Sequence, residues 1–140
     1  MAIKVFIYVT RNDGRELLVF DHPEAGTQVP KGTLEAGEEP LMGARRELLE
    51  EAGIETFRSF KLVATDRWRT HVRALFHVEL AHLPDSFDHI ATGSEAEEGL
   101  EFRYRWVPLE NAHNEVDYDM ADTISQLLDP IEVEPTRWVA

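Results

Sequence analysis

The chain has 140 residues, contains no cysteine and carries a formal net charge of −13 at pH 7. A chain of this length usually forms one domain around a single hydrophobic core, so we expect residues 1–140 to be one domain. The lack of cysteine excludes disulfides and thiolate metal sites, and the strong acidity argues against binding to duplex nucleic acid, which requires a basic face.

The N-terminus predicts a strand rather than a targeting segment. Its first ten residues, MAIKVFIYVT, are a short apolar run without a basic leader or a cleavage site. No apolar run in the chain reaches the length of a membrane span. We therefore expect a soluble, cytoplasmic protein with no membrane partner.

A β-hairpin is predicted at the start of the chain. Residues 2–10 are rich in β-branched and aromatic residues, an Asp-Gly turn follows at 11–14, and residues 16–20 form the return strand. Residues 21–27 contain proline and glycine and are predicted to be a loop. Residues 28–31 are predicted to be a short extended segment that leads toward the following helix.

A helix is predicted over residues 40–52. Pro40 suits its first turn, and Gly53 suits the position just past its end. Apolar residues recur at helical spacing between these two ends, namely at Leu41, Ala44, Leu48 and Ala52. The segment therefore has the pattern of an amphipathic helix with well-defined ends.

The second half of the chain predicts further strands and one more helix. The strands are expected over residues 57–69, 71–80 and 100–107, and the last two alternate clearly between apolar and polar residues. Residues 81–99 are predicted to be a long acidic loop, residues 119–128 a helix, and the tail an edge strand or a disordered segment. This order favours an α/β protein with a mixed sheet and a helix on each face, not a doubly wound parallel sheet.

Three acidic side chains gather on one side of the predicted helix at residues 40–52. Glu47, Glu50 and Glu51 are three or four residues apart, and Arg46 lies one turn away from Glu50 alone. Such a cluster of like charges is explained if a divalent cation neutralises it, and carboxylates suit hard cations such as Mg²⁺. For the acidic cluster taken alone, a solvated acidic face remains the simpler alternative.

The residues around this cluster form a longer pattern. Residues 32–54 read GTLEAGEEPLMGARRELLEEAGI. The defined positions of the pattern are Gly32, Glu38, Arg46, Glu47, Leu48, Glu50, Glu51, Gly53 and Ile54. At each of them the stretch resembles the Nudix box of the Nudix hydrolases, a motif far more specific than a short glycine pattern. The resemblance covers 23 of the 140 residues.

The resemblance implies a fold, a reaction and a set of metal ligands. The implied fold is an α/β/α sandwich around a central mixed sheet. The implied reaction is Mg²⁺- or Mn²⁺-dependent hydrolysis of a diphosphate linked to another group, usually in a nucleotide. By carry-over, Glu50 and Glu51 are the main metal ligands, and Glu47 is a ligand or the general base. Arg46 would orient its neighbouring glutamate, and the carbonyl of Lys31 would add a ligand, as in some relatives.

The resemblance also concerns acids outside the cluster. Glu38 matches a position whose part is mostly structural. Some family members take one more acid from a loop after the later strands, and here Glu95, Glu97 and Glu98 lie in such a loop. For each acid taken singly, a solvated side chain is the simpler explanation. Among the three we favour Glu97 or Glu98, and we predict that replacing Glu98 by Gln lowers turnover far more than substrate affinity. His22 is interpreted as a surface histidine.

Two sets of alternating arginines are candidates for phosphate binding. The sets are Arg67, Arg69 and Arg73, and Arg103 and Arg105. Strand geometry places each set on one face, so we predict that Arg67, Arg69 and Arg103 contact substrate phosphates. An outer sheet face with salt bridges is an equally good alternative. Nearby aromatic residues, Trp68, Tyr104 and Trp106, suit either base stacking or, more commonly, core packing.

The box does not define the leaving group. We expect a small-molecule substrate, namely a nucleoside di- or triphosphate or a related nucleotide. Pro30, Lys31 and Gly32 resemble the box entry of enzymes acting on dinucleoside or inositol polyphosphates, so a dinucleoside polyphosphate hydrolase is one alternative. The other is a non-catalytic Nudix-fold nucleotide-binding module, although such modules usually lose box acids. A homodimer is expected only by analogy with other family members.

Overall fold

In the computed structural model, the described part of the chain comprises residues 2–117, 120 and 124. Its strands are β1 (Ala2–Arg11), β2 (Glu16–His22), β3 (Gly26–Gln28), β4 (Lys31–Thr33), β5 (Ser59–Trp68), β6 (His71–Glu79), β7 (Ser86–Ile90) and β8 (Glu101–Pro108). Its helices are α1 (Pro40–Ala52) and a 3-10 helix, η1 (Leu109–Asn114). These strands form one eight-stranded sheet in the order β5-β6-β1-β2-β8-β7, with β4 also paired to β1 and β3 to β2.

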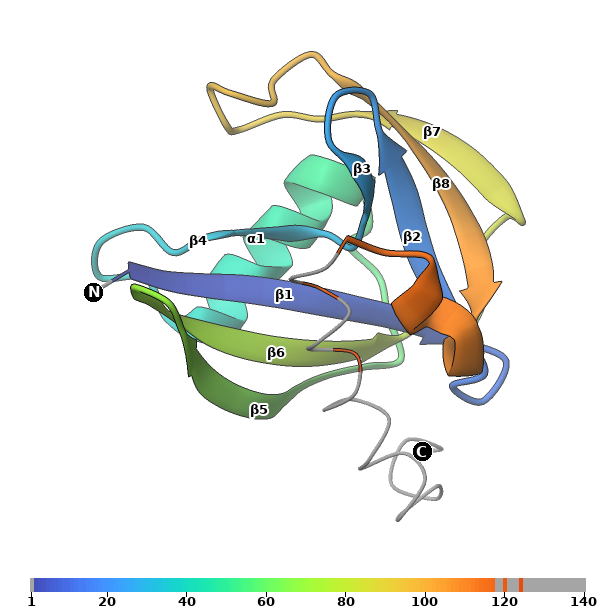
Figure 1. The fold of residues 1–140 in the computed structure, drawn as a ribbon, viewed down its shortest axis with the longest axis horizontal. Helices are drawn as coiled ribbons and strands as arrows, with labels where there is room; N and C mark the ends of the chain where they lie inside the picture. The colour runs from blue at the N-terminus through green and yellow to red at the C-terminus, as the bar shows by residue number, and fades with distance from the viewer. Residues whose placement is uncertain (1, 118–119, 121–123, 125–140) are drawn as a thin grey trace.

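The sheet opens into two halves at the β1–β2 hairpin. The two strands pair only next to their turn, through Thr10 with Leu17 and Arg11 with Glu16. The turn itself has left-handed φ values of 55°, 58° and 80° at residues 12–14, which suits its Asn-Asp-Gly sequence. Beyond the turn the strands diverge, so that β5, β6 and β1 run across the view in Figure 1 while β2 runs upward and β8 runs downward beside it.

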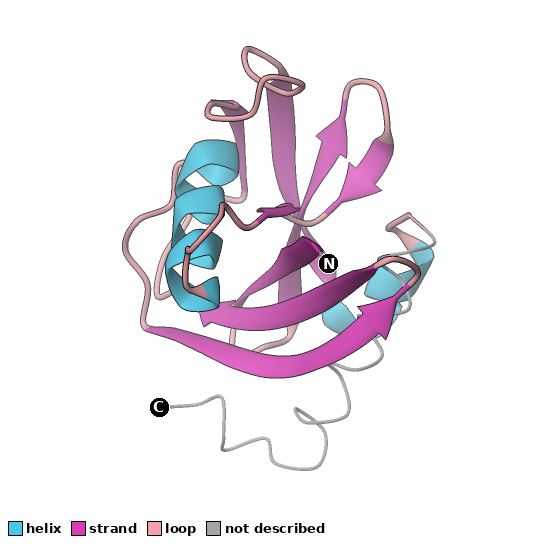
Figure 2. Ribbon diagram, turned by 90° about the vertical axis from the view of Figure 1, so that its left-hand side faces the viewer, coloured by secondary structure: helices cyan, strands magenta, loops and turns pink. Residues whose placement is uncertain are grey.

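The divergence leaves free edges that β3 and β4 occupy. Val5 of β1 pairs with Gly32 of β4, and Phe20 of β2 pairs with Gln28 of β3. α1 follows β4 and lies along one side of the sheet, where it contacts β4 and β1 (Figure 2). β1 and β6 are parallel and the other paired strands are antiparallel, which confirms the predicted mixed sheet.

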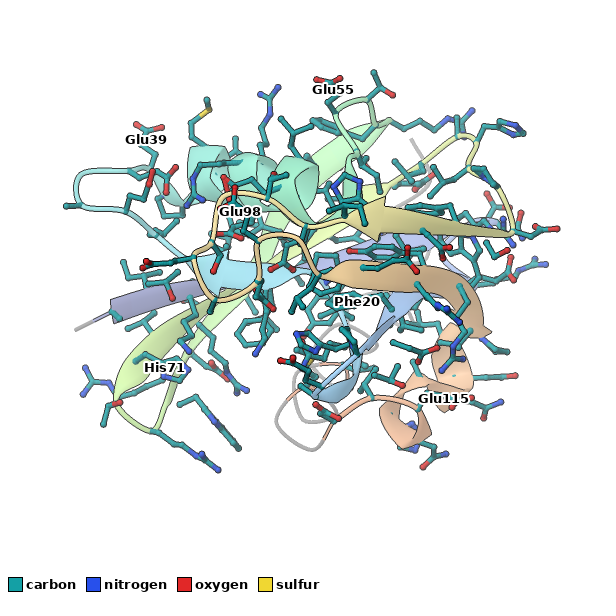
Figure 3. The ribbon with its side chains drawn as sticks, turned by 90° about the horizontal axis from the view of Figure 1, so that it is seen from above. Phe20, Glu39, Glu55, His71, Glu98 and Glu115 are labelled. Atoms are coloured by element: carbon teal, nitrogen blue, oxygen red, sulfur yellow. The ribbon has the colours of Figure 1, made fainter. Side chains whose placement is uncertain are left out.

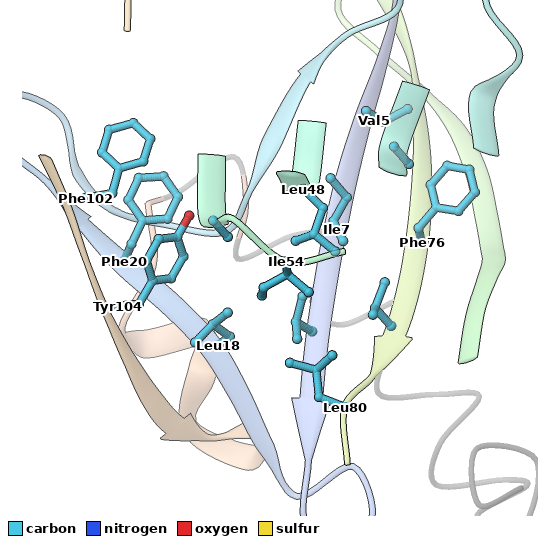
Figure 4. Packing of buried hydrophobic residues seen from close by; sticks show 14 of the residues in the cluster. Val5, Ile7, Leu18, Phe20, Leu48, Ile54, Phe76, Leu80, Phe102 and Tyr104 are labelled. Atoms are coloured by element: carbon cyan, nitrogen blue, oxygen red, sulfur yellow. The ribbon is translucent and has the colours of Figure 1, made fainter. Parts of the chain in front are cut away.

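Apolar side chains are packed on both faces of the sheet. On one face, Leu48 of α1 packs with Ile7 and Phe76, whose strands β1 and β6 are hydrogen-bonded to each other (Figure 4). On the other face, η1 packs with the helical residues Met120 and Ile124. The strands of the sheet centre are therefore buried from both sides, which makes them a rigid support for α1.

Three local predictions differ from the structure. The segment 81–99 is not a loop throughout, because residues 86–90 form the edge strand β7, which pairs only with β8. The predicted loop at 21–27 includes the end of β2 and the start of β3. η1 was not predicted at all. The predicted helix at 119–128 lies outside the described residues apart from Met120 and Ile124, and so does the tail.

The helix prediction over residues 40–52 is confirmed. Pro40 is in the first turn, and Gly53 ends the helix with a left-handed φ of 71°, donating its N–H to the carbonyl of Leu49 at 2.9 Å. No helix in the described part of the chain is long and apolar enough to cross a membrane.

Candidate active site

α1 turns two of its three clustered glutamates into the protein. The side of the helix that packs on the sheet carries Glu47 and Glu51, which are only 7% and 3% exposed. Glu50 is less deeply buried and lies at the edge of the same side. The helical spacing that predicted a shared side therefore holds, but the structure adds that this side is largely hidden from solvent.

Arg46 links the cluster to the loop before the helix. Its Nε and Nη2 donate to the two carboxylate oxygens of Glu38 at 2.8 Å each, and its Nη1 donates to Glu47 Oε1 and Glu50 Oε1 at 3.0 Å each. The Arg46 hydrogen bonds lower the pKa of Glu38 to about 2. Glu38 also accepts the backbone N–H of Glu35, which supports the structural part expected for it.

Two glycines make room for the carboxylates. A Cβ on Gly32 would overlap the Glu47 carboxyl group, and a Cβ on Gly93 would overlap that of Glu50. Gly93 also has a left-handed φ of 84°, which other residues rarely adopt. Position 32 of the box therefore requires a glycine, because a larger residue would leave no space for the Glu47 carboxyl group. Gly93, in a distant loop, leaves space for the Glu50 carboxyl group in the same way.

Glu51 is enclosed by groups from three other segments. The backbone N–H of Lys31 donates to its Oε1 at 3.1 Å, and the hydroxyl of Tyr104 donates to its main-chain carbonyl at 2.8 Å. Its carboxyl group lies beside that of Glu97. Burial raises the pKa of Glu51 well above its usual range and that of Glu47 to about 7. The metal-ligand role predicted for the Lys31 carbonyl stays a prediction.

The loop between β7 and β8 is fastened to the end of α1. The main-chain carbonyl of Glu50 accepts the N–H of Thr92 at 3.0 Å and lies 3.1 Å from Nε2 of His89. This attachment places Glu97, half-buried, against Glu51. Glu98 is exposed and does not line the cavity, so of the two loop acids favoured from the sequence, Glu97 and Glu98, the structure brings Glu97 to the cluster.

His22 was predicted to be a surface histidine, and this prediction was wrong. Its side chain is only 8% exposed, and its Nε2 lies 3.2 Å from Glu97 Oε2. The local sequence gave no indication of this contact, because the two residues are 75 positions apart.

A cavity of about 580 Å³ lies beside the cluster. Its lining includes the acids Glu47, Glu50 and Glu97, the bases Lys4, Lys31 and Arg46, and the polar residues His22 and Gln28. The wall thus combines carboxylates with cations, which suits a ligand that carries several negative charges and is bound together with a metal ion. Sequence reasoning missed Lys4 and Gln28, which strand pairing brings next to β4 and β2.

The structure does not bring the predicted arginines to this cavity. Arg67 and Arg69 lie at or beside the β5–β6 turn, and Arg103 is exposed and 3.7 Å from Glu101. Figure 3 shows His71, which starts β6 beyond that turn, well apart from Glu98 on the β7–β8 loop. Arg73 is buried against Asp66 at 2.6 Å.

The aromatic residues considered for base stacking also lie elsewhere. Tyr104 is buried and stacked on Phe87, Trp68 lies under the Arg73 guanidinium at 4.4 Å, and Trp106 lies under that of Arg11. None of the three lines the cavity. Packing against neighbouring side chains, which is the more common role of aromatic residues in strands, accounts for the positions of all three.

The donor set suits a hard divalent cation, although its geometry is not that of a formed metal site. Carboxylates are the ligands that Mg²⁺ and Mn²⁺ prefer, and four of them gather here, from Glu47, Glu50, Glu51 and Glu97. Among the described residues, however, no three acidic or histidine side chains stand in a metal-coordinating arrangement. The Nη1 group of Arg46 contacts one carboxylate oxygen of Glu47 and Glu50 at 3.0 Å each.

These features define a class: α/β proteins in which a strand–loop–helix unit presents glutamates to a polar cavity beside a mixed sheet. A family model described as NUDIX domain matches residues 2–127. The chain belongs to the Nudix family. A search of curated proteins gave no match.

Solved structures share the fold at low sequence identity. The E. coli dihydroneopterin triphosphate pyrophosphohydrolase is 16% identical, with a TM-score of 0.61 over 89% of this chain and 92% of that one. A MutT structure from work on Aliivibrio salmonicida and Vibrio cholerae is 20% identical, with a TM-score of 0.58 over 88% and 94%. The Bacillus subtilis pyrophosphohydrolase BsRppH, in a mutant form, is 14% identical, with a TM-score of 0.56 over 90% and 80%. These likenesses establish the fold.

Proposed function

We propose that this protein is a metal-dependent pyrophosphohydrolase that cleaves the diphosphate linkage of a nucleoside di- or triphosphate or a related nucleotide. The observation that carries the proposal is the convergence of Glu47, Glu50 and Glu97 on one cavity wall. The family membership agrees with it, and so does the fact that two of the similar structures are pyrophosphohydrolases.

Two lysines give this acidic chain a place for a polyphosphate. With a net charge of −13 the protein as a whole repels anions, so a phosphate ligand needs local cations. Lys4 and Lys31 border the cavity, and β4 pairs with β1 beside them. We infer that these two lysines, in place of the predicted Arg67, Arg69 and Arg103, attract the substrate phosphates.

The carboxylates would bind the cation and accept the proton of the attacking water. A divalent ion held by Glu47, Glu50 and Glu51 would neutralise phosphate charge and lower the pKa of water. Glu97 is the acid best placed to accept that proton at its carboxylate, since it borders the cavity and already takes part in hydrogen bonds. Arg46, anchored by Glu38, would orient Glu47 and Glu50 through its Nη1.

The test is product release from a panel of nucleoside diphosphates, nucleoside triphosphates and dinucleoside polyphosphates, with Mg²⁺, with Mn²⁺ and with EDTA. We expect metal-dependent hydrolysis of at least one compound, lowered in Glu51→Gln by about 100-fold or more. The best substrate in the panel decides between a nucleoside triphosphate and the dinucleoside polyphosphate alternative. Failure of the wild type to hydrolyse any compound with either metal would contradict the proposal.

A nucleotide-binding module is the second candidate. The observation that favours it is the engagement of Glu47 and Glu50 by Arg46 without a formed metal arrangement among the described residues. Calorimetry and product analysis with the same panel separate the two, because a binding module would bind a nucleotide and leave it intact even with Mg²⁺ or Mn²⁺ present.

A further inference from the structure

The imidazole of His22 is held in one orientation. His22 is the last residue of β2, and its ring packs against Phe102, with 5.1 Å between the ring centroids, and against Phe20 at 6.4 Å. Its Nδ1 accepts the backbone N–H of Glu24 at 3.0 Å. Aromatic packing on the ring and a backbone hydrogen bond at one nitrogen leave the second nitrogen with a fixed direction.

The contacts of the ring define its tautomer. Because Nδ1 accepts a hydrogen bond from a backbone N–H, it carries no proton, and the proton of the neutral ring must lie on Nε2. Nε2 lies 3.2 Å from Glu97 Oε2, so it donates to this carboxylate. His22 therefore presents a hydrogen-bond donor to Glu97 at a distance and in a direction that the fold determines.

His22 gives the Glu97 carboxylate a side-chain donor from β2. The Glu97 carboxyl group lies beside that of Glu51, which is itself held by the backbone N–H of Lys31. The backbone of the loop holds Glu97 through its N–H, which donates to Ser94 at 3.1 Å, but this bond does not orient the carboxylate. Among the described residues, the side-chain N–H that reaches the Glu97 carboxylate is that of His22.

We propose that His22 is a positioning residue that holds the Glu97 carboxylate beside Glu51, facing the cavity. This inference rests on the proposed function, in which Glu97 receives the proton of the attacking water. His22 itself does not touch the reacting atoms; its part is to keep Glu97 from turning out into solvent.

Two substitutions separate the donor from the ring. His22→Phe keeps an aromatic ring beside Phe102 and Phe20 but removes the donor, whereas His22→Gln keeps an N–H at about the position of Nε2. With the best substrate, we expect His22→Phe to lower kcat about 10- to 100-fold with KM changed less than about threefold, and His22→Gln to restore most of the loss. His82→Phe, the same change at an exposed histidine, should leave kcat unchanged.

A double mutant shows whether His22 acts through Glu97. In the Glu97→Gln background, His22→Phe should lower kcat no further, since the carboxylate that His22 orients is gone. If the two losses multiply, His22 acts independently of Glu97 and the proposal is overturned. An equal loss of kcat in His22→Gln and His22→Phe would also overturn it.

A measurement without turnover distinguishes this inference from the proposed function. Imidazole ¹⁵N NMR of the metal-free protein should show the Nε2–H tautomer for His22, and the Glu97 carboxyl ¹³C resonance should shift in His22→Phe but not in His82→Phe. An Nδ1–H tautomer, or a Glu97 resonance unaffected by His22→Phe, would overturn the positioning role even in an active enzyme. If the wild type hydrolyses nothing but shows both NMR results, the proposed function fails while the His22–Glu97 contact stands.

Discussion

Gly32 and Glu47 share a space that holds the Glu47 carboxyl group or a Cβ on residue 32, but not both. Gly32→Ala should therefore push Glu47 out of the cluster. We expect kcat to fall about 100-fold, as displacements near 1 Å do, and the free energy of unfolding to fall by about 1–3 kcal/mol from overpacking. Steady-state kinetics and urea denaturation measure the two effects.

Removing the Glu47 carboxyl group provides a control for the effect of Gly32→Ala. In a Glu47→Ala background the obstructing carboxyl group is absent, so adding Gly32→Ala should cost almost no further stability. An equal loss of stability in both backgrounds would show that position 32 matters for another reason, such as the β1–β4 pairing of Gly32 with Val5.

Neighbouring glutamates in the β7–β8 loop should respond differently to the same change. Glu97 faces the cavity and Glu98 is exposed. Glu97→Gln should lower kcat about 100-fold, within the range for loss of a general base, while Glu98→Gln should stay within about twofold of wild type. The reverse result would return the role to Glu98, where the sequence alone had placed it.

Arg46 should not tolerate lysine. A lysine keeps the charge but cannot bond both oxygens of Glu38 while also reaching Glu47 and Glu50. We expect Arg46→Lys to lower Tm by about 2–4 °C and kcat by about tenfold, because the carboxylates lose their alignment. Arg45→Lys is the matched control: Arg45 is exposed and lies over Phe57, so its Tm and kcat should remain near those of wild type.

The metal-free protein should become less stable as pH rises. Burial raises the pKa of Glu47 from 4.5 to about 7, so the folded state binds a proton that the unfolded state has released. The stabilisation is complete below pH 4.5 and is lost as pH rises through 7. We expect Tm in EDTA to be about 5 °C lower at pH 8 than at pH 5.5, measured by differential scanning fluorimetry.

Glu47→Gln should reduce this dependence, because the amide cannot ionise, and its Tm at pH 8 should exceed that of wild type. Mg²⁺ should raise the wild-type Tm more at pH 8 than at pH 5.5, since cations bind deprotonated carboxylates. Identical pH profiles for wild type and Glu47→Gln would show that Glu47 does not titrate in this range.

Local sequence was sufficient to predict α1 and the glutamates that it carries. Pro40 and Gly53 act within one turn of the helix ends, and the spacing of Glu47, Glu50 and Glu51 depends only on helical geometry. β7 was missed because an edge strand with one partner and an exposed outer face carries a weak apolar pattern.

Strand alternation correctly groups residues by face but does not say which face borders a site. For this reason Arg67, Arg69 and Arg103 were chosen for phosphate binding while Lys4 was overlooked. The same limit applies to Trp68, Tyr104 and Trp106, whose surroundings depend on which strands become neighbours in the sheet.

The family, the helix bounds and the glutamates of the helix can be predicted from the sequence, because these features depend on residues within a few turns of one another. The packing of distant segments is what brings Glu97, and not Glu98, to the cluster and places His22 against it. His22 and Glu97 come together because β2 diverges from β1 and because the β7–β8 loop is attached to α1. Such contacts arise from the packing of distant strands, which no local pattern encodes.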